Sequence, residues 1–211
     1  MTTYEFTLRF SLGDPDGDPE RFLDRLAGAG CDDAAVGIGQ RGRIALEFSR
    51  EARSASQAIL SALRDVKKAI PEARLVEVAP DFAGLTDVAR ILGCSRQNVR
   101  KLMIRRGSEF PPPVHEGNPA LWRLSKVLAW AQSRGHVIDE ALLEVARAAQ
   151  QVNLAREMQD AVPAIQEKAR ALIASSLTSL PSSPPLLPEG EGRFFAPLSL
   201  GRGAGGEGPL T

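Results

Sequence analysis

One run of residues, 85–102, limits how this chain can fold more than any other part of the sequence. Gly93 lies near its centre and accepts the left-handed backbone conformation that a tight turn between two helices requires. Ala89, four residues earlier, is small enough for the two helices to cross closely. Apolar residues flank the turn and return after it: Val88, Leu92, Cys94, Val99 and Leu102. The pattern predicts a helix-turn-helix, with helices over 85–92 and 95–104 and Ser95 capping the second helix.

The second predicted helix has an apolar side and a polar side. Val99, Leu102 and Met103 fall on the apolar side at helical spacing. Arg and Lys pair with guanine, and Gln and Asn with adenine, in the major groove of DNA. The residues expected to contact bases are Arg96, Gln97 and Arg100, with Asn98 at the edge of the polar side. The residues expected to contact phosphates are Ser95, Lys101, Arg105 and Arg106.

Charge is unevenly distributed along the chain. The whole sequence has 26 Lys and Arg against 26 Asp and Glu, so its formal net charge is zero. Residues 84–135, however, have 9 basic and 3 acidic residues, a net charge of +6. The segments 1–83 (11 basic, 14 acidic) and 136–211 (6 basic, 9 acidic) have −3 each. Because acidic segments flank the basic block, we expect modest, salt-sensitive non-specific affinity for DNA and targeting through base contacts.

Residues 84–134 resemble the winged helix-turn-helix domain of MerR, AlpA and excisionase-like bacterial DNA-binding proteins. The resemblance rests on LTDVA (85–89), GCSRQ (93–97), FPPPV (110–114) and LWRLSKVLAW (121–130). It implies that the proline-rich segment forms a wing beside the second helix. It also implies that Trp122 and Trp130 lie in the core and that Arg123 lies near the DNA backbone. MerR proteins begin with this domain, whereas here it follows an 80-residue module, so their effector-binding features are not transferred.

The first 80 residues predict a βαββαβ module. Thr3–Leu12 alternates apolar and polar residues, as a half-buried strand does, and further strands are expected over 34–40, 43–49 and 75–78. Asp18 and Pro19 begin a first helix, and a second runs from Ser56 to Ile70. This order predicts a ferredoxin-like sandwich, a four-stranded antiparallel sheet with two helices on one face, and an α+β chain overall. The module also resembles one that precedes such domains in uncharacterised bacterial DNA-binding proteins.

The remaining residues divide into a helical segment and a tail. Over 137–175 the sequence predicts an amphipathic helix broken near Pro163, with one apolar stripe: Ile138, Leu142, Val145, Ala149 and Val152. The stripe allows three arrangements: pairing with a second copy, which makes a homodimer through 138–174, folding back onto the domains, or marginal order. Residues 176–211 contain 7 Gly and 6 Pro without periodicity, which predicts a disordered tail.

No pattern of catalysis is evident in the sequence. Gly37–Gly42 spells G-x-G-x-x-G, but a strand pattern follows it where a dinucleotide site needs a helix, so a hairpin turn is the better interpretation. Two isolated cysteines, Cys31 and Cys94, and two isolated histidines, His115 and His136, predict neither a metal site nor a nucleophile with its base. We therefore expect no enzyme activity and no cofactor.

The sequence predicts a sequence-specific DNA-binding protein, a bacterial transcriptional regulator that reads the major groove of double-stranded DNA with the helix over 95–104. The N-terminal module would bind a partner or a small ligand. The alternative is an antitoxin-like or phage-derived adaptor. In that case the N-terminal module or the C-terminal helix binds a protein partner, and DNA binding is autoregulatory. Because we find neither a signal peptide nor an apolar run of about 20 residues, we expect no membrane association and a cytoplasmic, nucleoid-associated protein.

Overall fold

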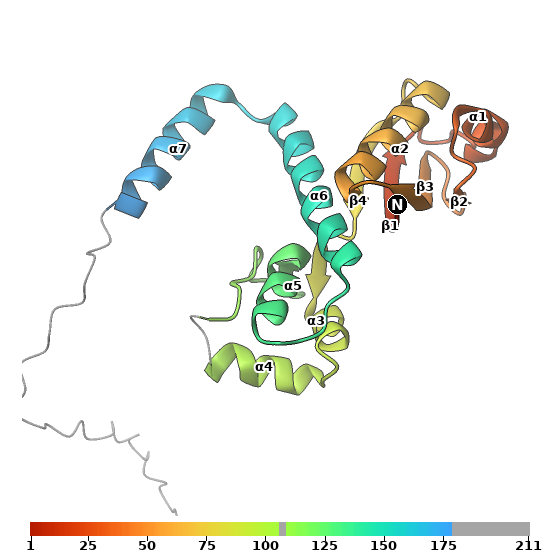
Figure 1. Cartoon of the computed structure of the whole chain (residues 1–211). Coiled ribbons are helices and arrows are strands. Elements are labelled where there is room, and N and C mark those ends of the chain that lie inside the picture. Colours follow the sequence, from red (N-terminus) through yellow and green to blue (C-terminus); the bar gives the residue numbers. More distant parts are fainter. Residues whose placement is uncertain (106–108, 179–211) are drawn as a thin grey trace, which may run out of the picture. The chain divides into compact units, whose positions relative to one another are not determined.

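The computed structural model describes residues 1–105 and 109–178, and its architecture is mixed α+β with antiparallel sheets (Figure 1). The chain divides into two compact units, residues 1–162 and the residues from 163 onward, and each is described by itself. Arg106 and residues 179–211, most of the expected tail, lie outside the described residues. None of the described helices is both long enough and apolar enough to span a bilayer.

Unit 1 begins with the expected four-stranded antiparallel sheet, whose strand order is β2-β3-β1-β4. Its strands are β1 (Thr2–Ser11), β2 (Ala34–Gly37), β3 (Arg43–Ala52) and β4 (Arg74–Ala79). β1 pairs with β3 along its whole length, from Thr2 opposite Ala52 to Ser11 opposite Arg43. Because side chains alternate along a strand, every second residue from Tyr4 to Phe10 shares one face, and that face is buried.

Two helices complete the core on this buried face. α1 (Leu23–Ala29) follows a 3-10 turn at Pro19–Phe22, and the Asp18 carboxylate accepts a hydrogen bond from Glu20 N at 3.0 Å, as an N-cap does. α2 (Ala55–Ala69) begins slightly earlier than the sequence predicted, because Ser54 is its N-cap. The core contains large side chains from the sheet and small ones from α2, including the stacked rings of Phe6 and Phe48.

The Gly37–Gly42 motif is a hairpin turn, which confirms the interpretation made from the sequence. β2 and β3 pair antiparallel on either side of it, with Gly37 opposite Ala45, and no helix follows the motif. Gly42 has a φ of +69°, and a Cβ there would lie 2.6 Å from the carbonyl oxygen of Pro15. Only glycine fits this position, because the loop before α1 crosses directly over it.

A buried arginine ties β3 to its neighbours in the sheet module. The Arg50 guanidinium donates to both carboxylate oxygens of Asp33 at 2.7 and 2.9 Å, and to Asp65 Oδ2 at 2.7 Å. It also donates to Gly30 O at 2.6 Å and Ser61 Oγ at 3.1 Å. These bonds, led by that to Asp33, raise the pKa of Arg50, so its charge is permanent and fully paired.

The second part of unit 1 contains three helices and a small two-stranded sheet. The helices are α3 (Leu85–Ile91), α4 (Arg96–Arg105) and α5 (Leu124–Ser133), close to the predicted bounds. The strands β5 (Phe82–Gly84) and β6 (Leu121–Arg123) pair antiparallel, with Ala83 opposite Trp122. The sequence analysis missed β5. The proline-rich segment therefore does not pair only with itself, because its last residues add to a strand that precedes α3.

α6 (Glu140–Glu157) folds back onto the rest of unit 1 and is shared by two hydrophobic cores. Val145, Ala148 and Ala149 pack into the core of the sheet module, whereas Leu143 and Ala146 pack into the core around α3 and α5. The homodimer expected through 138–174 is therefore wrong for α6, since its apolar residues are buried within the chain's own structure. The many alanines follow from this position, because a helix packed on two sides needs small side chains.

The chain breaks at the expected proline and continues as a separate helix. A 3-10 turn over Met158–Asp160 ends α6, and α7 (Pro163–Thr178) begins unit 2. The helix extends through Thr178, so the expected tail boundary at 176 is too early. Within the described part of α7, Ile165, Leu172 and Ile173 are exposed.

Candidate nucleic-acid interface

The connection between α3 and α4 has the geometry that the glycine pattern predicted. Gly93 has a φ of +61°, in the left-handed region, and a Cβ there would meet no atom within 4 Å. The amide of Gly93 donates to Arg90 O at 3.1 Å, and that of Cys94 donates to Ala89 O at 2.9 Å. Val88 and Val99 are fully buried on the two sides of the turn, and Ala89 lies between the helices. The turn thus holds α4 at a fixed angle to α3.

Both helices are capped by polar side chains from the run itself. Ser95 Oγ accepts a hydrogen bond from Asn98 N at 3.2 Å, which confirms the expected cap of α4. At the start of α3, Asp87 Oδ2 accepts one from Gly84 N at 3.0 Å. Ser95 remains exposed, so its hydroxyl lies at the N-terminus of α4, where a phosphate would be attracted by the helix dipole.

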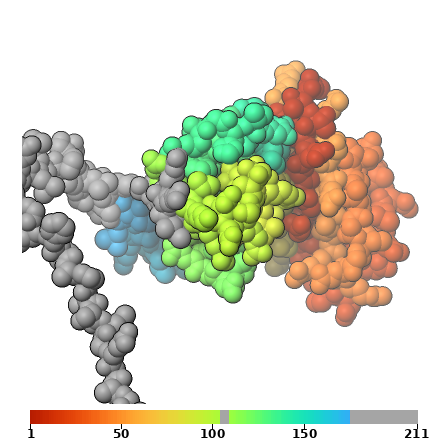
Figure 2. Space-filling view, turned by 90° about the horizontal axis from the view of Figure 1, so that it is seen from below, coloured from red at the N-terminus to blue at the C-terminus, as the bar shows by residue number. Residues whose placement is uncertain are grey.

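The outer side of α4 carries the side chains that the sequence analysis singled out. All five are exposed while Val99, between them in sequence, is buried: Arg96, Gln97, Asn98, Arg100 and Lys101. In the space-filling view of Figure 2, α4 (yellow-green) lies uncovered on the surface of unit 1. Within residues 1–105 and 109–178, Arg96, Arg100 and Lys101 form no ion pair with a carboxylate. Their positive charges are therefore available to an external anion.

The three acidic residues of the basic block 84–135 do not neutralise the positive charge of α4. Asp87 pairs with Arg90 at 3.1 Å, and Glu109 pairs with Arg134 at 2.6 Å. Glu116, the third, is exposed in the loop between Val114 and Leu121. Two of the three carboxylates are thus paired with arginines outside α4, and the potential at α4 remains positive.

Arg96 and Arg100 line a groove between α4 and the loop that precedes β6. The groove has a volume of about 210 Å³, and Met103 continues its α4 side at helical spacing. The loop residues 117–120 line it as well, together with Leu85 and Trp122. Backbone hydrogen bonds of Leu121 with Val114 N (2.8 Å) and His115 O (3.1 Å) close this loop. The two arginines therefore lie on the side of α4 that faces the loop, with Gln97 and Lys101 one position further round the helix.

An aromatic cluster supports the loop from below. Trp122 is buried, as the resemblance implied, and its Nε1 donates to Pro111 O at 3.2 Å. The Phe110 ring meets Trp122 edge-on at 6.3 Å and Trp130 edge-on at 4.9 Å between centroids. Trp130 is only half-buried. The proline-rich segment is thus fixed at both ends, by the Pro111 carbonyl and by β6.

Arg123 does not occupy the position expected of a DNA-backbone contact. Its guanidinium forms an ion pair with the buried carboxylate of Asp81 and lies 4.3 Å from the centroid of the Phe82 ring. The side chain is 11 % exposed, and that of Asp81 is 0 % exposed. The expectation was wrong because β6 pairs with β5, which places Arg123 opposite Phe82 and next to the buried acid. Arg123 is a structural residue in this fold.

A buried amide completes this junction and was missed by the sequence analysis. Asn153 Oδ1 accepts from Val78 N at 2.8 Å, and its Nδ2 donates to Val78 O at 2.9 Å and to Asp81 Oδ2 at 2.8 Å. The amide thus occupies the free edge of β4 and joins it to the start of the second part of unit 1. A signal was available, since Asn153 lies four residues after Ala149 on the apolar stripe of α6, where a polar residue predicts a buried partner.

Two of the expected phosphate contacts cannot be placed. Arg105 is the last residue of α4, but only its backbone is described, and Arg106 lies outside the described residues. Within the described parts of the chain, no group of three His, Cys, Asp or Glu side chains is arranged to hold a metal ion.

Comparison with protein-family models, with curated proteins and with solved structures finds no match to this chain.

Proposed function

We propose that this chain binds double-stranded DNA and reads the major groove with α4. The observation that carries the proposal is the outer side of α4, where three unpaired cations and two amide side chains are exposed on one helix face behind a left-handed glycine turn. Such a face suits base edges, because arginine and lysine donate to guanine, and glutamine and asparagine bond both ways to adenine. A helix face that contacts only water does not require side chains that can hydrogen-bond to bases.

We infer a finer description of the fold that accords with this function. Residues 1–80 form a ferredoxin-like module, an assignment supported by the β2-β3-β1-β4 order and by the two helices that follow β1 and β3. Residues 84–135 form a winged helix-turn-helix. The loop 117–120 is then the wing, and its support is the groove that it forms with Arg96 and Arg100.

The groove sharpens the roles of the individual side chains. Arg96 and Arg100 face the loop, so DNA that contacts both α4 and the loop meets both guanidinium groups. We assign base contacts to Arg96, Gln97 and Arg100, and a phosphate contact to Lys101. Ser95 and the N-terminus of α4 form a second phosphate contact. We further propose that the protein regulates transcription, since a protein that binds a specific DNA sequence can act by occupying its site.

The test is selection of bound sequences from a pool of random duplex DNA with the full chain, followed by anisotropy titrations at two salt concentrations. We expect one enriched motif, and a selected site that binds about 10³-fold or more tightly than a scrambled duplex of equal length. Affinity for the scrambled duplex should fall steeply with salt, as phosphate contacts release counterions. A pool that stays random, together with equal affinity for both duplexes, would contradict the proposal.

A further inference from the structure

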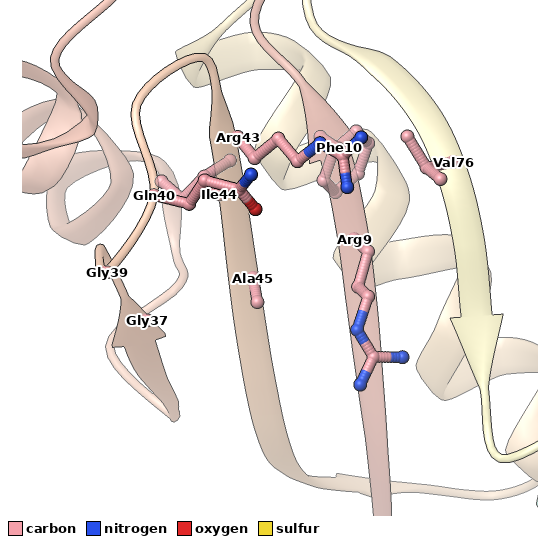
Figure 3. Close-up of a pocket in the computed structure, with 9 residues that line it drawn as sticks. All are labelled: Arg9, Phe10, Gly37, Gly39, Gln40, Arg43, Ile44, Ala45 and Val76. Atoms are coloured by element: carbon pink, nitrogen blue, oxygen red, sulfur yellow. The ribbon is translucent and has the colours of Figure 1, made fainter.

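The sheet has a second face on which neither α1 nor α2 packs, and within unit 1 α6 reaches it through Leu142 at one end. It carries the residues that alternate with the buried ones, and Figure 3 shows one end of it with the helices behind the strands. On β1 and β3 the long side chains of this face are exposed: Glu5, Arg9, Arg43, Glu47 and Glu51. Between them lie short side chains such as Thr7 and Ala45, so the side chains at the centre of the face project less from the sheet than those around them.

The charges on this open face are segregated along the strands. Register places Arg9, Arg43 and Arg74 near one end, where Ser11 lies opposite Arg43 in β3 and Arg74 in β4. Glu5, Glu47 and Glu51 lie near the other end, from Thr7 opposite Glu47 to Thr3 opposite Glu51. One pairing reduces the basic charge, because Arg9 binds Glu77 at 2.9 Å. The face therefore has a basic end and an acidic end.

Each end is hollowed rather than flat. At the basic end, Arg9, Arg43, Gly37 and Ala45 line a hollow of about 350 Å³ beside the exposed side chain of Val76, which is 42 % accessible (Figure 3). At the acidic end, Glu5 and Glu47 line a hollow of about 490 Å³ together with Pro80 and Leu142. Both hollows thus have apolar as well as charged residues in their lining.

We propose that the open face binds the same face of a second copy of this chain, with the two sets of strands antiparallel. Two identical sheets that stack face to face are related by a two-fold axis in the plane between them. If that axis runs along the strands, the basic end lies over the basic end of the other copy. If it runs across the strands, each basic end lies over an acidic end. Charge selects the second arrangement, in which Arg9 and Arg43 of one copy meet the glutamates of the other.

The size of the face is adequate for such an interface. The four strands have 10, 4, 10 and 6 residues. At about 3.3 Å per residue and about 4.8 Å between strands, they give a flat area of roughly 500 Å². Long side chains add to this area, and the hollows at both ends receive them, which brings the surface near the ~800 Å² per partner of a standard interface. This dimer replaces the one that the sequence placed on α6, and it does not depend on DNA binding.

The test is a charge exchange measured by sedimentation equilibrium of the full chain without DNA. The wild-type chain should be a dimer. Glu5→Arg with Glu47→Arg makes both ends basic, and Arg9→Glu with Arg43→Glu makes both ends acidic. We expect each double variant alone to dissociate at least ~100-fold more readily, and an equimolar mixture of the two to form a heterodimer again.

A matched control separates this effect from net charge. Arg64→Glu with Lys68→Glu changes the charge by the same amount as the acidic variant, but both side chains are exposed on α2, behind the opposite face of the sheet. This variant should remain a dimer, and circular dichroism should show that all variants are folded. A monomeric wild-type chain would overturn the proposal, as would variants that remain dimeric alone or a mixture that stays monomeric.

Discussion

Asn153 Nδ2 lies 2.8 Å from Asp81 Oδ2, and this hydrogen bond joins the far end of α6 to the segment between β4 and β5. Asp81 also holds Arg123, so one buried carboxylate receives an amide from one helix and a guanidinium from β6. The sheet module and the part of unit 1 that contains α3, α4 and α5 meet at this point. Because the two cores also share α6, a shift of one part changes the packing of the other.

The Asn153 amide is the first target for a test of this junction. Asn153→Ala leaves Val78 N and Val78 O without their partner and removes one of the two partners of Asp81, so we expect a loss of about 2–4 kcal/mol in the free energy of unfolding. Urea denaturation measures this loss, and hydrogen exchange should show faster exchange at the Val78 amide. Gln151→Ala, on the exposed side of the same helix, should cost less than about 0.5 kcal/mol. Equal effects of the two variants would contradict the assignment.

Arg123 should behave as a partner of a buried acid and not as a DNA contact. Arg123→Met leaves the Asp81 charge buried and uncompensated, so we expect a loss of about 3–5 kcal/mol in the free energy of unfolding. Adding Asp81→Asn removes that charge and should restore part of the stability, which a double-mutant cycle in urea measures. If Arg123→Met leaves stability unchanged but weakens DNA binding, the earlier expectation of a backbone contact is correct after all.

Gly93 tests the turn between α3 and α4. Gly93→Ala forces a side chain into the left-handed region without creating a clash, so its cost should be the backbone term alone, about 1–2 kcal/mol. Gly28→Ala is the matched control, because Gly28 is inside α1 with open space around it, and alanine there should stabilise by about 0.5–1 kcal/mol. Thermal unfolding compares the two. A neutral Gly93→Ala would mean that the turn does not constrain the helices.

The Cys31 thiol makes stability depend on alkaline pH. Burial, and then the nearby Asp65 carboxylate, raise its pKa to about 11. The thiol of the unfolded chain titrates near pH 8.5–9. Between about pH 9 and about pH 11 the folded chain therefore keeps the thiol proton, whereas the unfolded chain loses it. Stability should therefore fall as pH rises from about 9 to about 11, by roughly 2–3 kcal/mol from this group. Cys31→Ala should flatten the profile of unfolding free energy in this window; identical profiles would contradict the assignment.

Local patterns predicted the elements of this fold well. The alternation around Tyr4–Phe10 predicted β1, and Gly93, Ser95 and Val99 predicted the turn, the cap and the buried side of α4. These features depend on residues close together in sequence, so periodicity and turn chemistry report them. The exposed residues of α4 followed directly, because a helix with one side buried has the other side free.

Contacts between distant residues were not predictable in the same way. β5 has three residues and no alternation long enough to detect, and its partner β6 follows it by more than thirty positions. The resemblance implied that Arg123 lies near the DNA backbone, whereas this pairing places it beside Asp81. The apolar stripe of α6 was visible in the sequence, but a stripe does not say which surface covers it.

The central claim, that α4 reads DNA, is tested most directly by two alanine variants on the selected duplex. Binding of Arg100→Ala is compared with that of Arg64→Ala, an equal charge change on exposed α2, by anisotropy at fixed salt. We expect Arg100→Ala to weaken binding to the selected site by about 1–3 kcal/mol, and to relax selectivity at one base position. Arg64→Ala should leave both unchanged. If the two variants bind alike, α4 does not read the sequence and the account fails.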